Sequence, residues 1–290
     1  KYAVLKNKNH PWGLLDNKEL LQSAGLYLTD HLTGKSGYTL ACILLFGKDE
    51  TIMSVCPQHR TDLIKRVNNL DRYDDRDDVR TNLIDTYFRM TKFIEKHLDA
   101  GFALDEQGIR YSPRDLLFRE AIANSIIHRE YRERTVATMV IEKDKVVFEN
   151  GCIPYGHGTI TLTNFQPKSK NPRIAYVFNN MGLADELGSG VRNMYKYNEI
   201  YSKASPTFIE GEVFKTVIPL VSNDDVEQIN IDSKSLIVKH IKEYGSITTS
   251  DAINISNLKK TRVVELLNEL LEEEIILRIG KGPKTQYILK

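Results

Sequence analysis

Residues 113–151 constrain the fold more strongly than any other part of the chain. Pro113 stands at the first turn of a stretch, LLFREAIANSIIHRE, that has helical spacing. Its apolar face is broad and is formed by Leu116, Phe118, Ala121, Ile122, Ser125 and Ile126. The next segment, TVATMVIEKDKVVFENG, predicts two β-strands around a polar turn at 142–145. An α/β (α+β) fold, with helices packed on a mixed sheet, is therefore expected.

The remaining elements follow from local patterns. Helices are predicted at Asn17–Ala24, 84–98, 174–183 and 191–201, and a β-hairpin at 206–220. The longest apolar run, YTLACILLFG at 38–47, predicts a buried strand. Residues 71–80 (DRYDDRDDVR) mix acids with arginines, which favours a solvated loop or helix start over a metal site.

Composition limits the class of protein. A length of 290 residues suggests about two domains, with 27% charged and 41% hydrophobic residues, as in ordinary soluble proteins. A net charge of +1 means that any nucleic-acid-binding patch must be local. Isolated Cys42, Cys56 and Cys152 form no CxxC pair, which fits a reducing, cytoplasmic location. No apolar run reaches the roughly 20 residues that span a bilayer, so no membrane is expected. A first residue other than Met suggests a piece of a longer protein.

Two polar residues stand four apart in the helical stretch LLFREAIANSIIHRE. Asn124 could supply an amide oxygen to a magnesium ion, and Glu120 could orient or deprotonate an attacking water. Their spacing places both side chains on one helix face, one turn apart. The pair is the candidate metal ligand and the candidate catalytic base of a nucleotide site.

Two glycine-bearing turns could complete such a site. Glu149 in FENG could accept a hydrogen bond from an adenine amino group, and Gly151 would let the backbone approach the base. Gly188 and Gly190 in GSG precede a helix, whose N-terminal N–H groups could bind phosphate oxygens. The order of helix, strand pair, ENG turn and GSG helix carries more weight than any single motif.

This order resembles that of the GHKL (Bergerat-fold) ATPases. More closely, FREAIANSIIHREY, FENGCIPYG, SKNPRIAYVF and GLADELGSGV resemble the HATPase-type, RecG-related domain of Schlafen/AlbA-type transcriptional regulators. The resemblance covers 99–221 and implies a divergent GHKL domain that binds ATP with Mg²⁺. Residues 1–98, through TLACILLFG, resemble the C-terminal part of the preceding AlbA-type domain.

The chain also departs from that pattern. Glu149 stands where the superfamily has an adenine-reading aspartate, Ile153 replaces a glycine, and 154–180 is unlike an ATP lid. The structural alternative is a fold that has kept this helix and these turns but has lost the ability to bind nucleotide. No GxxxxGK loop occurs, which argues against a motor helicase. His128 is expected to be a satisfied histidine at a helix end rather than a phosphate contact.

The last part of the chain changes character. An acidic, polar linker is predicted at 222–231, and 232–290 reads as helix, helix, helix and hairpin, like a winged helix-turn-helix domain. The predicted DNA contacts are donors at the start of the third helix and in the wing: Asn257, Lys259, Lys260, Thr261, Arg262, Lys281 and Lys284. A winged helix used for protein contact is the alternative.

These features together predict a DNA-binding transcriptional regulator. Its partner would be duplex DNA, and ATP or another ligand in the central domain would modulate binding. One alternative is a magnesium-dependent ATPase with Glu120 as the base, and another is a non-catalytic dimerisation scaffold. A homodimer fits a regulator that reads a palindrome.

Overall fold

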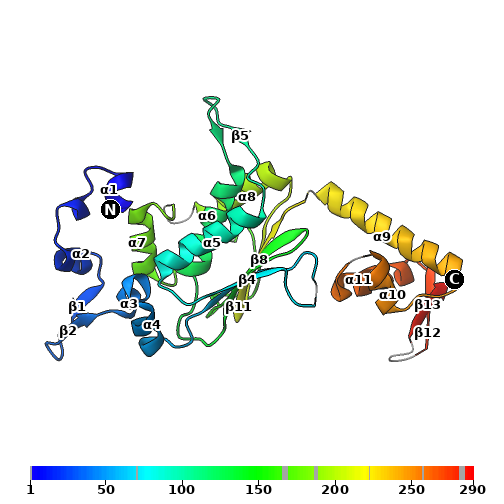
Figure 1. Cartoon of the computed structure of the whole chain (residues 1–290), viewed down its shortest axis with the longest axis horizontal. Helices are drawn as coiled ribbons and strands as arrows, with labels where there is room; N and C mark the ends of the chain where they lie inside the picture. Colours follow the sequence, from blue (N-terminus) through cyan, green and yellow to red (C-terminus); the bar gives the residue numbers. More distant parts are fainter. Residues whose placement is uncertain are drawn as a thin grey trace. The chain divides into compact units, whose positions relative to one another are not determined.

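The computed structural model describes residues 2–69, 71–164, 169–185, 189–221, 223–256, 258–280 and 285–290, with backbone alone for 2, 6 and 223–232. The chain divides into two compact units, Lys1–Leu220 and Val221–Lys290. Each unit is described separately below (Figure 1).

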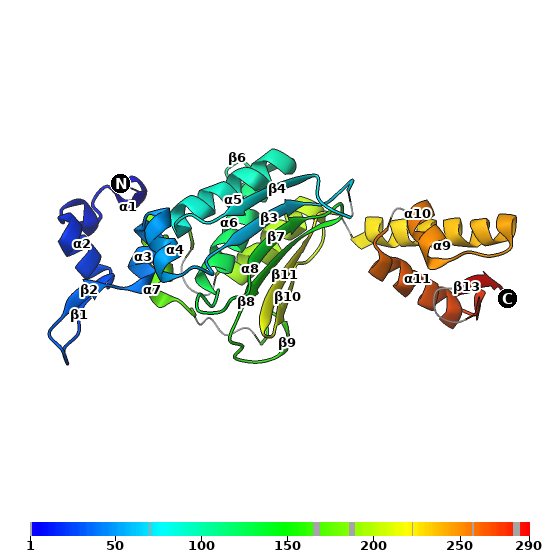
Figure 2. The ribbon, with the colours of Figure 1, turned by 60° about the horizontal axis from the view of Figure 1, so that its bottom comes forward.

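A seven-stranded sheet forms the centre of the first unit (Figure 2). Its order is β4-β3-β7-β8-β11-β10-β9, with β3 parallel to β7 and the other neighbours antiparallel. The strands are β3 (Thr61–Lys65), β4 (Asp75–Val79), β7 (Ala137–Ile141), β8 (Lys145–Gly151), β9 (Gly158–Ile160), β10 (Thr207–Glu210) and β11 (Val213–Pro219). The mixed α/β prediction is confirmed in this respect.

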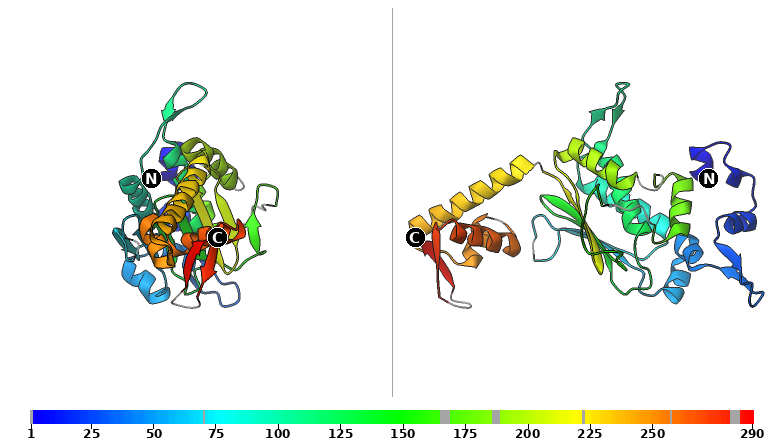
Figure 3. Two further views of the ribbon diagram at one scale, coloured as in Figure 1. Left: turned by 90° about the vertical axis from the view of Figure 1, so that its right-hand side faces the viewer. Right: turned by 180° about the vertical axis from the view of Figure 1, so that it is seen from behind.

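Helices α5 (Leu83–His97), α6 (Pro113–Ile127) and α8 (Gly190–Ser202) cover one face of this sheet (Figures 2 and 3). Alternate strand residues face them, because successive strand side chains point to opposite faces. Met139 on β7 and its partner Phe148 on β8 are almost fully buried there, and the Phe118 ring on α6 lies 6.4 Å from that of Phe148. The helices predicted at 84–98 and in LLFREAIANSIIHRE, and the strand pair after the second one, are confirmed.

The segment at 38–47 is a helix, so the predicted strand is wrong. Helix α3 (Leu40–Phe46) begins after Thr39, whose hydroxyl accepts a hydrogen bond from the Cys42 N–H at 3.2 Å. Cys42, Leu44 and Leu45 are buried, whereas Phe46 is exposed. A short apolar run does not distinguish a buried strand from a buried helix, and the N-cap threonine was the missed signal.

The other elements of the N-terminal region and its surroundings are short. They are α1 (Tyr2–Lys6), a 3₁₀ turn η1 (Pro11–Gly13), α2 (Asn17–Ser23), the hairpin β1 (Tyr27–Thr29) and β2 (Ser36–Tyr38), α4 (Asp49–Val55) and α7 (Pro172–Met181). A further hairpin, β5 (Ala103–Leu104) with β6 (Arg110–Tyr111), projects from the unit beside α6 (Figures 1 and 3).

The charged segment 71–80 contains the edge strand β4, which corrects the predicted loop or helix start. The charged residues of β4 form ion pairs with neighbouring elements. Asp75 accepts from Lys96 and His97 of α5 at 2.7 Å, and Arg76 forms a bidentate pair with Asp62 of β3 at 2.7 Å. Charged residues on an edge strand discourage pairing with another chain, so their density is compatible with a strand.

No boundary falls at 98/99, although one was predicted there. Strands β3 and β4 belong to the same sheet as β7–β11, and Leu63 contributes to the same buried core as Met139. Residues 1–98, which resemble the end of an AlbA-type domain, therefore do not form a separate unit. Two different resemblances meet at that point in the sequence, whereas the sheet contains strands from both sides of it.

The second unit contains three helices followed by a hairpin. They are α9 (Asn223–Tyr244), α10 (Thr249–Ser256), α11 (Lys260–Glu272), β12 (Ile276–Ile279) and β13 (Gln286–Leu289). Its core includes Ile237, Ile241, Val263, Leu267 and Leu270. The predicted linker 222–231 is wrong from Asn223 onward, since α9 begins there.

Among the helices described in both units, none is long and apolar enough to cross a membrane.

Candidate functional site

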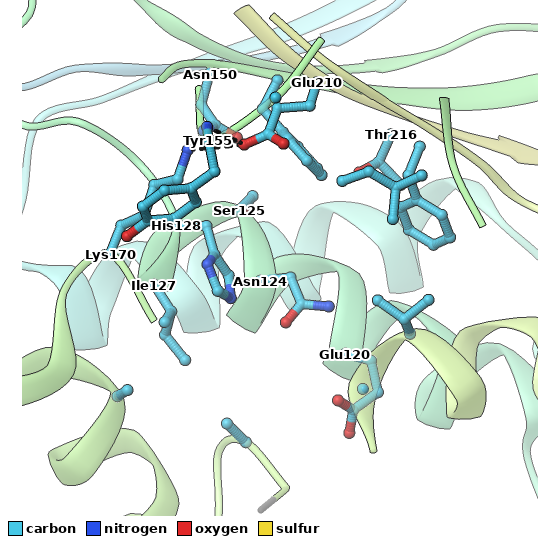
Figure 4. Close-up of a pocket in the computed structure, with 18 of the residues that line it drawn as sticks. Glu120, Asn124, Ser125, Ile127, His128, Asn150, Tyr155, Lys170, Glu210 and Thr216 are labelled. Carbon is cyan, nitrogen blue, oxygen red and sulfur yellow. Dashed lines mark hydrogen bonds and ion pairs between the residues drawn. The ribbon is translucent and has the colours of Figure 1, made fainter. Parts of the chain in front are cut away.

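A cavity of about 360 Å³ lies in the first unit, between α6, the start of α8 and the strands β8, β10 and β11 (Figure 4). Its polar lining residues include Glu120 and Asn124 from α6, His128 at the end of that helix, Asn150 from β8, Tyr155 and Lys170 from the following segment, Asp185 before α8, Glu210 from β10 and Thr216 from β11. Apolar lining residues include Ile160, Val191, Phe208 and Phe214. A large cavity with a few convergent polar groups is typical of a small-molecule site.

Helix α6 presents three polar side chains to this cavity. Glu120, Asn124 and His128 are spaced four residues apart and therefore share one helix face. Ser112 fixes the start of the helix, because its hydroxyl accepts from the Asp115 N–H at 3.2 Å. Figure 4 shows the three side chains directed from one helix toward the same space.

Gly190, at the start of α8, packs directly against two of these residues. A Cβ built on Gly190 would lie 3.1 Å from Glu120 Oε2 and 3.3 Å from Asn124 Nδ2. Any side chain there would crowd both polar groups. The structure thus brings together three of the predicted residues, Glu120, Asn124 and Gly190, although they were chosen from two separate motifs.

Glu120 is buried beside a second acid. Its carboxylate receives a hydrogen bond from Arg119 Nη2 at 3.1 Å, and the same nitrogen donates to Asp185 Oδ1 at 2.8 Å. Asn193 of α8 donates to the other oxygen of Asp185 at 3.0 Å. Burial, together with the charge of Asp185, raises the pKa of Glu120 to about 7, although Arg119 opposes the shift. Near neutral pH the group can therefore exchange a proton.

The amide of Asn124 is largely uncommitted. Its Nδ2 lies 3.5 Å from Met194 Sδ, and the described residues provide no hydrogen-bond donor to its Oδ1. An amide oxygen of this kind is a suitable ligand for a hard cation such as Mg²⁺. The geometry therefore suits the predicted metal role of Asn124, beside a carboxylate that is partly protonated at neutral pH.

The opposite part of the cavity centres on Lys170. Its ammonium group contacts Cys152 Sγ, donates to Ile153 O at 2.7 Å, and lies 3.4 Å from Glu210 Oε1. The backbone N–H of Tyr155 also donates to Glu210 Oε1, at 3.0 Å. These contacts fix the wall of the cavity and occupy the donors of Lys170.

His128 ends α6, as predicted, but its side chain faces the cavity. Its backbone N–H donates to Asn124 O, and the described residues offer its ring no hydrogen bond. Burial, reinforced by the charge of Lys170, lowers the pKa of His128 to about 4. The imidazole is therefore neutral at pH 7 and can both donate and accept. The sequence had instead led us to expect a histidine at the helix end whose ring is hydrogen-bonded within the protein.

Glu149 and Gly151 do not reach the cavity. Glu149 pairs with Lys215 Nζ at 2.9 Å on the sheet face away from α6. Its neighbour Asn150, buried and on the Phe148 side of β8, lines the cavity instead. Gly151 is closely packed, but against Thr135: a Cβ there would lie 3.0 Å from Thr135 Cβ. Strand alternation explains the shift by one residue.

Gly188 lies outside the described residues, as do Asn257, Lys281 and Lys284 of the second unit. Lys260 and Thr261 are exposed in the first turn of α11, after a partly buried Lys259. Arg262 is engaged within the helix, since its Nη1 donates to Glu265 at 2.7 Å and to Glu269 at 3.3 Å. The structure thus leaves Lys260 and Thr261 accessible and commits Arg262 to neighbouring acids.

Sequence reasoning missed several lining residues. The four-residue period that joins Glu120 to Asn124 extends to His128, and the period of two from Phe148 leads to Asn150. Both could have been found. Arg119, Asp185, Lys170 and Thr216 depend on contacts between distant segments, for which the sequence offers no local signal.

Comparison with known proteins supports part of this interpretation. Residues 138–218 match the family described as "Putative ATP-dependent DNA helicase recG C-terminal", a range that runs from β7 to β11. Helix α6 lies before this range, so its role in the site depends on the geometry above. Residues 1–62 match a domain of unknown function, DUF8451. A search of curated proteins finds no match.

Among solved structures, the chain is similar to the DIP2311 protein from Corynebacterium diphtheriae. The two are 17% identical with a TM-score of 0.56, and the alignment covers 100% of this chain. The chain spans 60% of the length of that protein. At this identity the likeness shows a shared fold alone.

Proposed function

We propose that the cavity of the first unit binds a magnesium nucleotide such as ATP, in a divergent GHKL-like domain. The observation that carries this proposal is the close packing of Gly190 against Glu120 and Asn124 at the wall of one cavity. A buried carboxylate, an amide oxygen and a glycine at a helix start are together suited to a metal-bound phosphate. The family match at 138–218 supports the same class of ligand.

The acidic lining of the cavity explains why the proposed ligand is a nucleotide bound to Mg²⁺ rather than a free nucleotide. The acids that line the cavity are Glu120, Asp185 and Glu210, against a single described lysine, Lys170. That lysine already contacts Cys152, Ile153 O and Glu210. A triphosphate alone would be repelled by this lining, whereas a nucleotide whose charge is reduced by Mg²⁺ would not. Asn124 Oδ1 is the group that would hold the ion.

Calorimetric titration of ATP into the intact protein tests this proposal, with and without Mg²⁺. We expect binding in the presence of Mg²⁺, and an affinity about 10–100-fold lower in Asn124→Ala. Asn254→Ala is the matched control, since Asn254 is exposed in the other unit. Equal affinity in Asn124→Ala and wild type, or no heat under any condition, would refute the assignment.

We further propose that the protein is a transcriptional regulator that binds duplex DNA through a winged helix in the second unit. The element order is helix, helix, helix and hairpin, and Lys260 and Thr261 are exposed at the start of the third helix. The N-terminal end of such a helix is the part that meets the major groove. Nucleotide in the first unit would modulate this binding, and a homodimer would suit a palindromic operator.

A gel-shift assay with duplex DNA at low salt tests the DNA proposal. Lys260→Glu is expected to weaken binding and reduce its salt dependence, because a phosphate contact becomes a repulsion. Lys239→Glu carries the same charge change at an exposed position of α9. Equal losses in both variants would indicate non-specific electrostatics, and no binding by the wild type would favour a dimerisation scaffold.

Hydrolysis is a second candidate activity, and the protonation of Glu120 favours it. A carboxyl group with a pKa of about 7 is suited to accept a proton from an attacking water. Phosphate release from ATP that disappears in Glu120→Gln, with nucleotide affinity retained, would establish this activity. Binding without turnover would leave ATP as an effector.

A further inference from the structure

Arg129, immediately after the cavity residue His128, is a buried cation to which the described residues offer no charged partner. It is 3% exposed, and its Nη1 donates a long hydrogen bond to Thr61 Oγ1 at 3.4 Å. Its Nε is buried and has no hydrogen-bond partner among the residues that the structure describes. Across the described part of the chain, no carboxylate oxygen lies within 4.0 Å of the guanidinium.

Such an arrangement is unfavourable in isolation. Burial lowers the pKa of Arg129, but a guanidinium remains charged in proteins. The ring of Tyr131 lies 5.3 Å from the guanidinium carbon and offers a cation–π contact, which provides no counter-charge. An uncompensated buried charge destabilises a fold strongly, so a compensating group is expected.

Neighbouring side chains do not provide it. Cys56 is protonated, since burial raises its pKa, and its Sγ donates to Tyr131 O at 3.4 Å. His59 is neutral, since burial lowers its pKa to about 4. Glu149 lines the same small cavity as Arg129, but its side chain is 39% exposed and its carboxylate is bound to Lys215 at 2.9 Å. Within the described chain, the positive charge of Arg129 is thus unmatched.

A small cavity adjoins the guanidinium. It has a volume of about 10 Å³, and its polar lining comes from Arg129, Tyr131, Glu149 and the hydroxyl residues Thr61, Ser125 and Thr138. Ser125 also lines the large cavity. A space of this size accommodates about one water-sized particle, so phosphate, sulfate and carboxylate ligands are too large.

We propose that this second cavity binds one halide-sized monovalent anion, chloride under ordinary conditions, with Arg129 as its charged ligand. The guanidinium provides the attraction, and the hydroxyl of Thr61, which accepts from Arg129 Nη1, can donate its own proton to the anion. A water molecule would fill the space but would leave the charge uncompensated. The anion would stabilise the first unit in the segment that links α6 to β7, next to His128 of the nucleotide cavity.

Thermal unfolding of the intact protein tests the proposal. Chloride, bromide and the bulky anion gluconate are compared as sodium salts at equal ionic strength. In the wild type, chloride and bromide are expected to raise the midpoint of the first unit by about 2–4 °C relative to gluconate. In Arg129→Met this difference should vanish, because an apolar side chain needs no counter-ion.

Arg132→Met is the matched control, since Arg132 is exposed and paired with Glu130. It removes the same charge three residues away and is expected to keep the chloride effect. An equal effect in wild type and Arg129→Met, or no difference between chloride and gluconate in the wild type, would overturn the proposal.

A diffraction experiment avoids any dependence on the folding of Arg129→Met. Crystals of the wild type grown in bromide should give an anomalous peak beside the Arg129 guanidinium. Density without an anomalous signal would identify water and would also overturn the proposal. Neither experiment involves nucleotide. Their results would therefore stay the same even if the proposed nucleotide binding were refuted.

Discussion

The contact between Gly190 and the polar face of α6 is the most specific feature at the scale of single residues. Alanine at position 190 would place a Cβ 3.1 Å from Glu120 Oε2 and 3.3 Å from Asn124 Nδ2. We expect Gly190→Ala to weaken magnesium-nucleotide binding at least about 10-fold. Stability should change by less than about 1 kcal/mol, since alanine favours the helix that begins there.

Titration of nucleotide into Gly190→Ala, with thermal unfolding in parallel, checks this expectation. Gly211→Ala is the control, because a Cβ there would meet its nearest neighbour, Val213 O, at an ordinary 3.7 Å. Unchanged affinity in Gly190→Ala would show that the close packing does not shape the binding site.

The pKa of Glu120 has a consequence for stability. A buried acid with a pKa raised from 4.5 to about 7 binds more protons in the folded state than in the unfolded state between these values. Its contribution to stability is therefore fully present below about pH 4.5 and is lost as the pH rises through 7. Glu120→Gln cannot ionise, so it should be stabilised relative to the wild type at pH 8.

The expected gain is on the order of 1–3 kcal/mol at pH 8 and close to zero at pH 4.5. Denaturant unfolding at both pH values measures it. The wild type itself should still lose stability on acidification from pH 6.5 to 4, because His59 and His128, with pKa values of about 4, must be protonated when the chain unfolds. A pH-independent difference between Glu120→Gln and wild type would contradict the assigned burial.

At the scale of elements, the apolar segment 38–47 shows what local patterns leave open. Gly47 ends α3, and its N–H donates to Ile43 O at 2.8 Å. A Cβ on Gly47 would collide with that same oxygen and would lie 3.2 Å from Ile52 Cγ1. Gly47→Ala should therefore destabilise the first unit by about 1–3 kcal/mol.

Denaturant unfolding of Gly47→Ala and Gly37→Ala provides the comparison, because a Cβ at Gly37 would meet open space. Gly37→Ala should lie within about 0.5 kcal/mol of the wild type. Equal stability of the two variants would mean that the end of α3 adjusts freely.

The elements that the sequence predicts well are those with a sustained period and a clear start. Helix α6 has Ser112 and Pro113 at its beginning, and its four-residue spacing places Glu120 and Asn124 in the cavity. The strand pair that follows was also correct, but the choice of Glu149 over Asn150 required knowing which strand face the helices cover. That information comes from long-range packing, as do the contacts of Asp185 and Lys170.

At the scale of the whole molecule, the division into two units predicts two unfolding steps. Every described residue that lines the large cavity lies within Lys1–Leu220, whereas Val221–Lys290 has its own core around Ile237 and Leu267. In calorimetry, magnesium and ATP should therefore raise the midpoint of one transition and leave the other unchanged. A single transition that shifts as a whole would show that the units unfold together.

That division was predicted at nearly the right place, but for an incorrect reason. The acidic, polar stretch 222–231 was predicted to be a linker, yet α9 begins at Asn223. Conversely, the boundary expected at 98/99 is crossed by the sheet, since β3 is parallel to β7. Pairing between distant strands leaves no mark on local composition, so the sequence could not reveal it.

The route between the two units is short. Thr216 on β11 lines the large cavity, and the strand continues to Pro219, one residue before the first unit ends at Leu220. Helix α9 begins at Asn223. Along the chain, six residues, 217–222, stand between Thr216 and the start of α9. A ligand that contacts Thr216 would therefore touch the strand that leads directly, along the sequence, into the second unit.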